Sequence, residues 1–352
     1  MNTQSAGPTT GMESGGPERV GSLEPMAGLV FRPWRGADDV AAMARVANAS
    51  NDADTVDERT SPEELLNFFI RGDEHFDPGL DLTVVELAGE LIAYGWVGWA
   101  DTTDGLREYR LSGYVHPAWR RRGVGHRLLA WQEDRARAIA AGHDVDRPRV
   151  FGTWSPEARV GKRALVEASG FRPVRWFFEM QRTYLDSVDV PPLPDGIEVR
   201  PIGTDRASLR GLFDADAEAF RDHWGGWNAT DANFEEWLSD PKFDPSIFVV
   251  AWEGDQIAGA VINTISAHEN AAFNRQRGWL DSVFVRPPWR RRGLAQALVA
   301  RSLVALRERG ITEAMLGVDS ENPTGAVGVY ERAGFTVSHR GIAYRKAWEE
   351  RE

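Results

Sequence analysis

The sequence contains no cysteine among its 352 residues. Disulfide bonds, thiolate metal ligands and a cysteine nucleophile are therefore excluded, and we expect no metal site. No apolar run reaches the roughly 18 residues that a membrane-spanning helix needs. Basic residues are in the minority, because 41 lysines and arginines stand against 53 aspartates and glutamates, for a formal net charge of −12. A chain this acidic is a poor candidate for binding a nucleic-acid backbone along its length.

The beginning of the chain also lacks the features of an export signal. It is rich in Gly, Ser, Thr and Pro, without the basic start and apolar centre of a signal peptide. We interpret residues 1–27 as a flexible tail, and we expect a cytoplasmic protein without a membrane partner. The whole chain is 42% apolar, and at 352 residues it suits two domains better than one.

The block Trp-Arg-Arg-Arg-Gly occurs twice, at 119–123 and at 289–293. The similarity extends to both sides, since VHPAWRRRGVGHRLL (115–129) matches VRPPWRRRGLAQALV (285–299), and EASGF later parallels ERAGF. The two blocks lie 170 positions apart. This spacing is far longer than the roughly 20–50 residues of a solenoid repeat, so it indicates the duplication of a whole domain.

Each copy repeats one order of expected elements. A starting strand leads into helices, then two strands around a tight turn at Gly89 or Gly254, a further strand, the arginine block opening a helix, another strand, a short helix ending in Gly-Phe and a last strand. This is a mixed α/β pattern, α+β-like, with a mixed sheet in two tandem domains. Segment 186–195 is rich in proline and has little that could pack, so it is predicted to be a linker between domains 28–185 and 196–350.

The arginine block lies between a strand and a helix in both copies. That position turns unpaired backbone N–H groups and the positive end of the helix dipole toward one point, where phosphate oxygens bind well. The glycine permits close approach, and the arginines add positive charge. The plainest alternative is a solvated basic turn that caps a helix, but its recurrence after a Val-x-Pro strand end favours a phosphate site. A nucleic-acid-binding module is a further alternative, although interleaved stacking aromatics are not evident.

The strand, the V-x-P-x-W-R-R-R-G-x-G/A loop and the later Gly-Phe resemble the Gcn5-related N-acetyltransferases (GNAT). The resemblance covers about 150 residues in each half. The tandem layout is similar to that of the mycothiol synthases, although nothing in the sequence fixes that substrate. The resemblance implies two tandem GNAT-like acyl-CoA N-acyltransferase domains with acetyl-CoA as co-substrate. Its pyrophosphate would lie on the arginine loop and its pantetheine arm along the preceding strand.

The resemblance implies donor-binding residues in both copies. Asn322 would contact the CoA arm, and it also looks like a helix N-cap followed by proline at N1. The other residues implied in the second copy are Val283, Phe284, Val285, Arg290, Arg291, Arg292, Gly293, Leu294, Ala295 and Gln296. Those implied in the first copy are Gly113, Tyr114, Val115, Arg121, Arg122, Gly123, Val124, Gly125 and His126.

The two copies differ in the residues that acetyl transfer needs. The family's tyrosine before Gly-Phe often serves as the acid; it is Tyr330 in the second copy, whereas Val166 stands there in the first. Asp281 aligns with Leu111 of the first copy, and its carboxylate could accept a proton from the amine, directly or through water. Structural interpretations stay open, with Tyr330 as a core aromatic and Asp281 as a hydrogen-bonded structural aspartate. We predict chemistry in the C-terminal domain and a non-catalytic N-terminal domain.

The acceptor side is expected in segment 219–237, where His223 and Trp224 stand beside a pair of glycines. His223 could instead be the general base, and the segment could simply be a helix end whose aromatics pack onto the core. We expect the acceptor to be a small-molecule or peptide amine; the oligomeric state stays open. The sequence thus predicts an acetyl-CoA-dependent N-acetyltransferase acting on a primary amine. The alternative is a non-catalytic acyl-CoA-binding or sensor protein.

Overall fold

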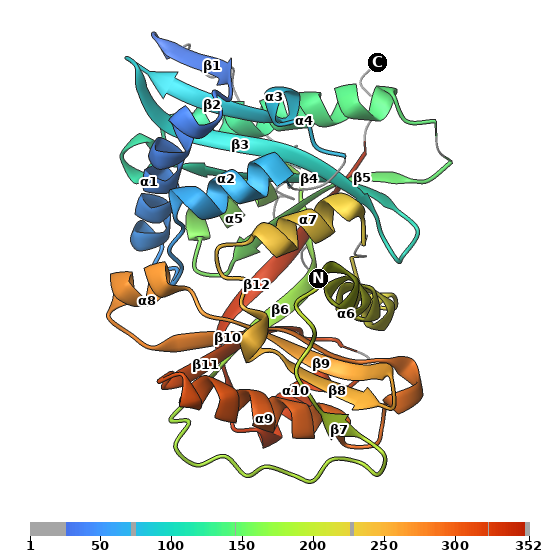
Figure 1. The fold of residues 1–352 in the computed structure, drawn as a ribbon. Helices are drawn as coiled ribbons and strands as arrows, with labels where there is room; N and C mark the ends of the chain where they lie inside the picture. Colours follow the sequence, from blue (N-terminus) through green and yellow to red (C-terminus); the bar gives the residue numbers. More distant parts are fainter. Residues whose placement is uncertain (1–25, 72–74, 145, 226–228, 323, 349–352) are drawn as a thin grey trace, which may run out of the picture.

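The structure is a computed structural model, and it describes residues 26–71, 75–144, 146–225, 229–322 and 324–348. The predicted tail, residues 1–27, lies outside these ranges except for Met26 and Ala27. Within the described residues one mixed sheet runs through the whole molecule, with helices on both of its faces (Figure 1). The mixed α/β architecture predicted from the sequence is confirmed.

The first copy follows the predicted order of elements. Its hairpin turns at Ala88 and Gly89, whose φ angles of 51° and 83° are the left-handed values that a two-residue hairpin turn needs. The elements are β1 (Leu29–Pro33), α1 (Ala37–Ala53), α2 (Pro62–Arg71), α3 (Pro78–Asp81), β2 (Leu82–Leu87), β3 (Glu90–Asp101), β4 (Arg107–Val115), α4 (Val124–Ala141), β5 (Arg149–Pro156), α5 (Val160–Ala168) and β6 (Arg172–Thr183).

The second copy repeats this order with two differences: a short 3-10 helix, Pro245–Ile247, takes the place of α3, and one short α-helix is added between the third and fourth strands. Its hairpin turns at Gly254, again with a positive φ, of 59°. The elements are β7 (Glu198–Val199), α6 (Arg206–Phe220), α7 (Asp231–Ser239), β8 (Val249–Glu253), β9 (Gln256–Thr264), α8 (Ala267–Phe273), β10 (Arg277–Val285), α9 (Leu294–Glu308), β11 (Glu313–Asp319), α10 (Ala326–Arg332) and β12 (Thr336–Ala347).

The last strands of the two copies are exchanged in the middle of the sheet. The strand order is β1-β2-β3-β4-β5-β12-β6-β11-β10-β9-β8-β7. β12 pairs antiparallel with both β5 and β6, and β6 pairs antiparallel with β11. The last strand of the second copy therefore completes the sheet of the first copy, and the last strand of the first completes that of the second.

Helices on opposite faces bury separate apolar clusters in each half. In the second half, α6 and α7 cover Val250, Ala260 and Phe284, whereas α9 and α10 cover Val249, Val261 and other side chains of the opposite face. In the first half, α1 and α2 pack on one face, and α4 and α5 on the other. None of the helices in the described ranges is long and apolar enough to cross a membrane.

The connection between the copies packs more closely than its composition suggests. Leu185 is 2% exposed, and Val188 and Leu193 pack against the cluster under α9. Arg301 donates to the carbonyl of Pro191 at 2.9 Å, and other arginines of the second copy bond further carbonyls of this segment. The expectation that segment 186–195 has little that could pack was wrong, because a few apolar side chains and many backbone acceptors suffice to hold it.

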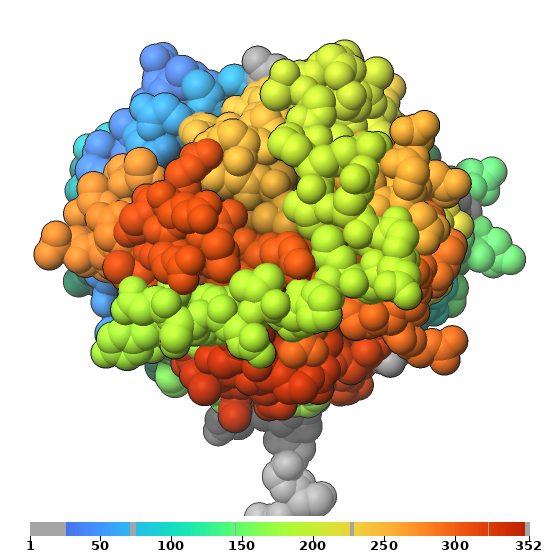
Figure 2. Space-filling view, turned by 60° about the horizontal axis from the view of Figure 1, so that its bottom comes forward, coloured from blue at the N-terminus to red at the C-terminus, as the bar shows by residue number. Residues whose placement is uncertain are grey.

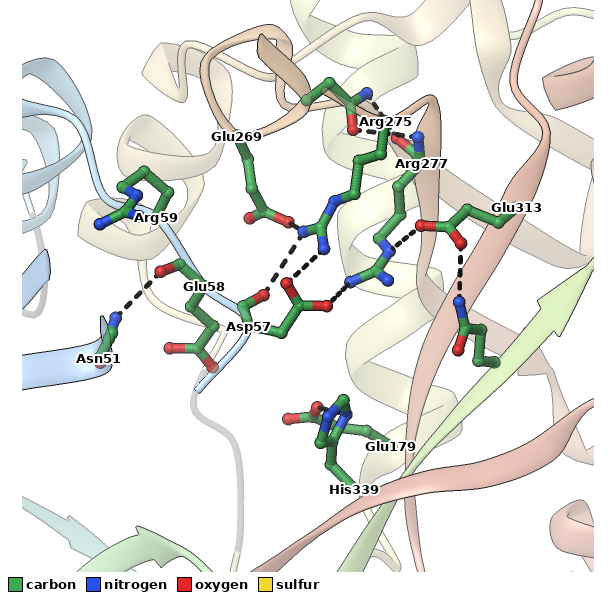
Figure 3. A network of polar contacts seen from close by, with 12 residues as sticks. Asn51, Asp57, Glu58, Arg59, Glu179, Glu269, Arg275, Arg277, Glu313 and His339 are labelled. Carbon is green, nitrogen blue, oxygen red and sulfur yellow. Dashed lines mark hydrogen bonds and ion pairs between the residues drawn. The ribbon is translucent and has the colours of Figure 1, made fainter. Parts of the chain in front are cut away.

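A network of ion pairs joins the loop after α1 to the second copy (Figure 3). The carboxylate of Asp57 accepts hydrogen bonds from Arg275 at 2.5 Å and from Arg277 at 2.6 Å. Arg277 also pairs with Glu313 at 2.7 Å, and its side chain is only 6% exposed. Among the described residues of the first copy, Asp57 is therefore the one that forms ion pairs with both arginines.

We predict that Asp57→Asn lowers the free energy of unfolding at neutral pH by about 1–3 kcal/mol, because Arg275 and Arg277 each lose one of their two carboxylate partners, and Glu269 and Glu313 alone remain. Burial alone raises the pKa of Asp57, but the hydrogen bonds from Arg277 and Arg275 hold it below its ordinary value. A lowered carboxyl pKa stabilises the fold above the unfolded pKa, and that stabilisation is lost as the pH falls. The difference in the free energy of unfolding between the wild type and Asp57→Asn should therefore become smaller as the pH falls.

Urea unfolding at several pH values measures this difference. Asp144→Asn, at an exposed position after α4, serves as the matched control and should leave stability unchanged. A deficit of the same size at neutral and acidic pH would contradict an ionic origin.

Candidate active site

A cleft of about 1150 Å³ opens in the second copy, where β10 and β11 separate. The two strands run parallel and pair only from Arg277 to Trp279, after which they diverge. Strands that separate leave backbone N–H and C=O groups free to bind a ligand. The first copy opens in the same way, since β4 and β5 pair only over residues 107–110.

A β-bulge at Asp281 distinguishes the second copy. β10 pairs with β9 at Leu280 and again at Ser282, so Asp281 is the extra residue. Its side chain is exposed to solvent inside the cleft, yet the surrounding protein raises its pKa by desolvation; Lys242 opposes this shift and Asp240 adds to it. In the first copy β3 and β4 pair without interruption, and Leu111, at the equivalent position, is buried.

A second carboxylate lies behind the bulge. Asp216, on α6, accepts a hydrogen bond of 2.5 Å from the hydroxyl of Ser282. Burial raises the pKa of Asp216 to about 7, against the effect of this hydrogen bond, and the charge of Asp281 raises it further. The sequence analysis missed Asp216, because an aspartate on an amphipathic helix looks like part of a solvated face. The first copy has the buried Ala47 at the equivalent position, because Ala219 and Ser50 accept the same bond from the first arginine of each block.

The arginine loops of the two copies have the same backbone. After a single helical turn, Arg121 and Arg291 both have a φ of 61°, and Gly123 and Gly293 have φ values of 80° and 82°. A Cβ on Gly293 would meet no atom within 4 Å, so the space in front of this loop is open. Helix α9 starts directly after Gly293, with its first N–H groups free for an anion.

The first arginine of each block holds the loop together. Arg290 donates to the carbonyl of Val285 at 3.1 Å and to that of Ala219, on α6, at 2.9 Å. Arg120 likewise donates to the carbonyl of Val115, and it forms an ion pair of 2.6 Å with Asp54, the residue directly after α1. These guanidinium groups are therefore bound to the protein, which leaves the exposed Arg291 as the arginine of the second block that faces the cleft without a bonded partner among the described residues.

Nearly all of the predicted residues of the second copy line this one cleft. Arg292 is the exception; it bonds the carbonyl of Asp195 at 2.9 Å. The side chain of Phe284 packs into the core under α6, so only its backbone is available on the other side. The predicted residues that line the cleft are His223, Asp281, Val283, Phe284, Val285, Arg290, Arg291, Gly293, Leu294, Ala295, Gln296, Asn322 and Tyr330.

Tyr330 reaches the cleft from α10, and Asn322 reaches it from the segment between β11 and α10. Tyr330 is 6% exposed, and burial raises the pKa of its phenol. The prediction that Asn322 caps the helix was wrong, because α10 begins only after Gly325. The side chain of Asn322 instead accepts hydrogen bonds from the backbone and hydroxyl of Thr324, at 2.8 and 2.6 Å. This turn leaves Asn322 at the cleft.

His223 lies on the opposite wall, in the loop after α6. Its ring is partly buried and stands edge-on to Phe220, with ring centres 4.3 Å apart. Burial lowers its pKa, and the positive charge of Arg290 lowers it further. The carbonyl of His223 accepts a bond of 2.9 Å from Thr103 of the first copy, so the two copies together fix this loop.

The predicted residues of the first copy lie outside this cleft. Tyr114 stacks with Trp96, and the guanidinium of Arg159 lies 4.8 Å from the centre of its ring. A Cβ on Gly113 would lie 2.6 Å from the carbonyl oxygen of Tyr94, so the backbone is tightly packed there. Val115 ends β4, and segment 121–126 leads into α4 in the loop geometry described above.

The strand exchange brings residues of the first copy into the cleft of the second. Trp154 of β5 and Glu179 of β6 line it, together with Gly341 of β12. The ring of Trp154 lies close against Gly341, where a Cβ would approach it to 2.4 Å. Burial raises the pKa of Glu179. No local sequence signal predicts these residues, because they reach the site only through strand pairing.

Comparison with known proteins identifies the same domain twice. The sequence model of the acetyltransferase (GNAT) family matches residues 43–146 and 209–335. Curated relatives include a mycothiol acetyltransferase of Geodermatophilus obscurus, 32% identical over 320 residues, which cover 88% of this chain and 94% of the relative. A second mycothiol acetyltransferase, of Salinispora arenicola, is 30% identical over 315 residues, covering 88% and 92%.

Solved structures give the same result for the fold. A GCN5-related N-acetyltransferase of Sphaerobacter thermophilus superposes with a TM-score of 0.67 at 29% identity, covering 92% of this chain and 96% of that one. A tandem GNAT protein of the clavulanic acid biosynthesis pathway superposes with a TM-score of 0.69, covering 92% and 100%, at 18% identity.

We predict that Asp216→Asn raises the stability of the fold, and more so at pH 8 than at pH 5. A carboxyl whose pKa is raised on folding favours the protonated native state, so the wild type loses stability as the pH rises toward about 7. Asparagine cannot ionise and escapes this loss.

Thermal unfolding at pH 5 and pH 8 measures the effect. The control is Asp214→Asn, at an exposed position on the same helix, where the advantage should not grow with pH. An equal change in Tm at both pH values for Asp216→Asn would refute the raised pKa.

Proposed function

Because the chain belongs to the acetyltransferase (GNAT) family, whose members use acetyl-CoA as donor, we propose that its second copy transfers the acetyl group to a primary amine. The relatives are named as acetyltransferases, which favours an enzyme over the non-catalytic acyl-CoA-binding or sensor protein. In this proposal the first copy is not catalytic, and it supports the site through the exchanged strands.

The donor would bind across the arginine loop and into the opening between β10 and β11. The free N–H groups at the start of α9, with Arg291 beside them, suit the pyrophosphate. The separated strands offer backbone groups to the amides of the pantetheine arm, as Asn322 does from the other wall. The thioester would then lie at the inner end of the cleft, between Asp281 and Tyr330.

The chemistry needs a base for the amine and an acid for the departing sulfur. As the amine nitrogen attacks the thioester carbon, Asp281 takes the proton of the amine, directly or through water, and the C–S bond breaks as the C–N bond forms. Tyr330 gives its proton to the sulfur, so that CoA leaves as a thiol. A raised pKa suits Asp281 to this task, because it remains a competent base near neutral pH.

The main support for placing the chemistry in the second copy is that Asp281 and Tyr330 line the same cleft. The first copy keeps the loop, but it has Leu111 in an uninterrupted strand and Val166 on α5, and both side chains are buried and apolar. A copy without a titratable group at either position lacks the base and the acid. This contrast favours the second copy as the site of acetyl transfer.

The inner end of the cleft suits a cationic acceptor. Asp281 and Glu179 both line it, and the burial that raises their pKa values would be offset by a bound ammonium group. Aromatic side chains of the first copy, among them Trp154, complete the wall. Since the relatives are named mycothiol acetyltransferases, an unacetylated form of mycothiol is the first acceptor to test, within a wider set of small amines.

We predict that Tyr330→Phe lowers kcat about 100-fold, because the thiolate would leave without a general acid. The KM for acetyl-CoA should change little, since the ring remains in place. Steady-state kinetics with the best acceptor test this. The control is Tyr344→Phe, which removes a buried hydroxyl of β12 that bonds Glu167 at 2.8 Å, remote from the cleft. If Tyr330→Phe kept the full kcat, Tyr330 would not be the general acid.

We predict that Gly293→Val raises the KM for acetyl-CoA about tenfold or more, because a β-branched side chain fits neither the positive φ nor the approach of a phosphate. Gly123→Val is a matched control, since it has the same strain in the first loop. It should leave KM and kcat of the second copy within about twofold. If only the Gly123 variant lost activity, the chemistry would belong to the first copy.

A further inference from the structure

The chain contains only three lysines, at positions 162, 242 and 346. Two of them are paired with carboxylates: the amine of Lys346 lies 2.7 Å from an oxygen of Glu133, and that of Lys242 lies 3.7 Å from an oxygen of Glu64. The amine of Lys162 has no hydrogen bond or ion pair among the described residues, although its side chain is partly buried. A partly buried ammonium group without a counter-charge is unfavourable, so Lys162 differs in kind from the other two.

Lys162 lies on α5 where the first copy opens. The alignment of Val166 with Tyr330 places Lys162 at the position of Ala326. Ala326 and Tyr330 lie one turn apart on α10, and both line the cleft of the second copy. The repeat of the fold therefore places Lys162 beside the gap that β4 and β5 leave after their last pair, at residues 110 and 152. We call this gap, with the loop 120–125 beside it, the first opening.

The arginine loop beside the first opening is accessible to a ligand. Arg121 and Arg122 are exposed, and α4 starts directly after Gly123, so its first N–H groups are free for an anion. The connection between the copies does not cover this loop, because it runs as a yellow-green band across orange and red segments of the second copy (Figure 2), where Arg301 bonds one of its carbonyls. The first loop can therefore receive a phosphate from solvent.

Arg159 closes the first opening on the side of α1. It directly precedes α5, on one face of the sheet, yet it donates at 2.5 Å to the side chain of Asn51, on α1 of the other face. Its guanidinium lies 4.8 Å from the ring centre of Tyr114, on β4, and both Arg159 and Asn51 are buried. In the second copy Pro323 stands at the equivalent position and has no side chain of this reach. An external amine that approached from α1 would meet Arg159, which leaves Lys162 as the amine within the first opening.

Lys162 is suited to act as a nucleophile without a base. Burial, with a smaller effect from the charge of Arg159, lowers the pKa of its amine to about 7. A large share of this amine is therefore neutral at neutral pH, whereas an ordinary lysine, with a pKa of about 10.4, is almost entirely charged. A neutral amine can attack a thioester directly, because no proton has to be removed from it first.

We propose that Lys162 is acetylated by acetyl-CoA held on the first loop, so that the first copy modifies itself. The lone pair of Nζ attacks the thioester carbon, and the C–N bond forms as the C–S bond breaks and leaves its electron pair on sulfur. The surplus proton on nitrogen passes to the sulfur, and CoA leaves as a thiol. The step occurs once per chain and is not turnover, because acetylated Lys162 has no amine left to react. It rests on the proposed function only in taking acetyl-CoA as the donor.

Mass spectrometry of the full chain after incubation with acetyl-CoA, without an added amine, tests this. We expect one acetyl group per chain, assigned to Lys162 by peptide mapping, at a rate that saturates as the concentration of acetyl-CoA rises. Lys162→Arg keeps the positive charge and should lose the modification, while the kcat of its second copy stays within about twofold and shows that the variant folds. Lys346→Arg is the matched control and should be acetylated at Lys162 like the wild type.

Variants of the two loops and the pH dependence separate this site from the second copy. Gly123→Val should slow the acetylation of Lys162 about tenfold or more, whereas Gly293→Val should leave its rate within about twofold. The rate should reach half its limit near pH 7, as the pKa of Lys162 requires. An ordinary lysine would instead react faster at each step toward its pKa of about 10.4.

Three results would overturn the proposal: acetyl groups spread over all three lysines, a rate that grows linearly with acetyl-CoA, or an unchanged rate in Gly123→Val. So would a chain that transfers acetyl groups to an added amine and yet carries none on Lys162, and that result would leave the proposed function intact. Acetylation of Lys162 in a chain that acetylates no added amine would support this proposal and count against the proposed function, so the two fail separately.

Discussion

The pairing of β6 with β12 in the middle of the sheet is the constraint on which the rest of the molecule depends. Each of these strands completes the half to which it does not belong by sequence, and each also pairs with the other. Removal of either would leave a row of unsatisfied backbone groups between β5 and β11. The two copies are therefore held by main-chain hydrogen bonds as well as by the ion pairs around Asp57.

The same exchange shapes the site. β6 brings Glu179 to the cleft, and the contact between Gly341 and Trp154 sets the position of the indole on its far wall. A single GNAT-like domain would have to supply this wall from its own last strand. Duplication followed by exchange lets the first copy contribute to a cleft that it does not open, which gives a physical reason for keeping a copy that lacks the titratable groups.

The features that could be predicted from the sequence are those that depend on residues close together in the chain. The hairpin turns, the arginine loops and the gathering of Asp281, Tyr330 and His223 depend on local pattern, and the structure confirms the turns and brings these side chains to one cleft. The strand exchange depends on pairing between residues more than about 125 positions apart, which no local pattern records. The prediction that Asn322 caps the helix was wrong because an asparagine side chain can also close a turn, and here it bonds Thr324 before α10 begins.

Asp216 illustrates a further limit, because its environment rather than its spacing gives it significance. On an amphipathic helix an aspartate normally faces water, but the bulge at Asp281 carries Ser282 toward α6 and encloses Asp216 behind it. Burial raises the pKa of Asp216, and the negative charge of nearby Asp281 raises it further, because two neighbouring carboxylates repel each other when both are ionised. The fold loses stability near neutral pH at this point, and it gains a group at Asp281 that can take up a proton there. Such a cost at a single bulge, absent from the otherwise similar first copy, is what a site retained for proton transfer would show.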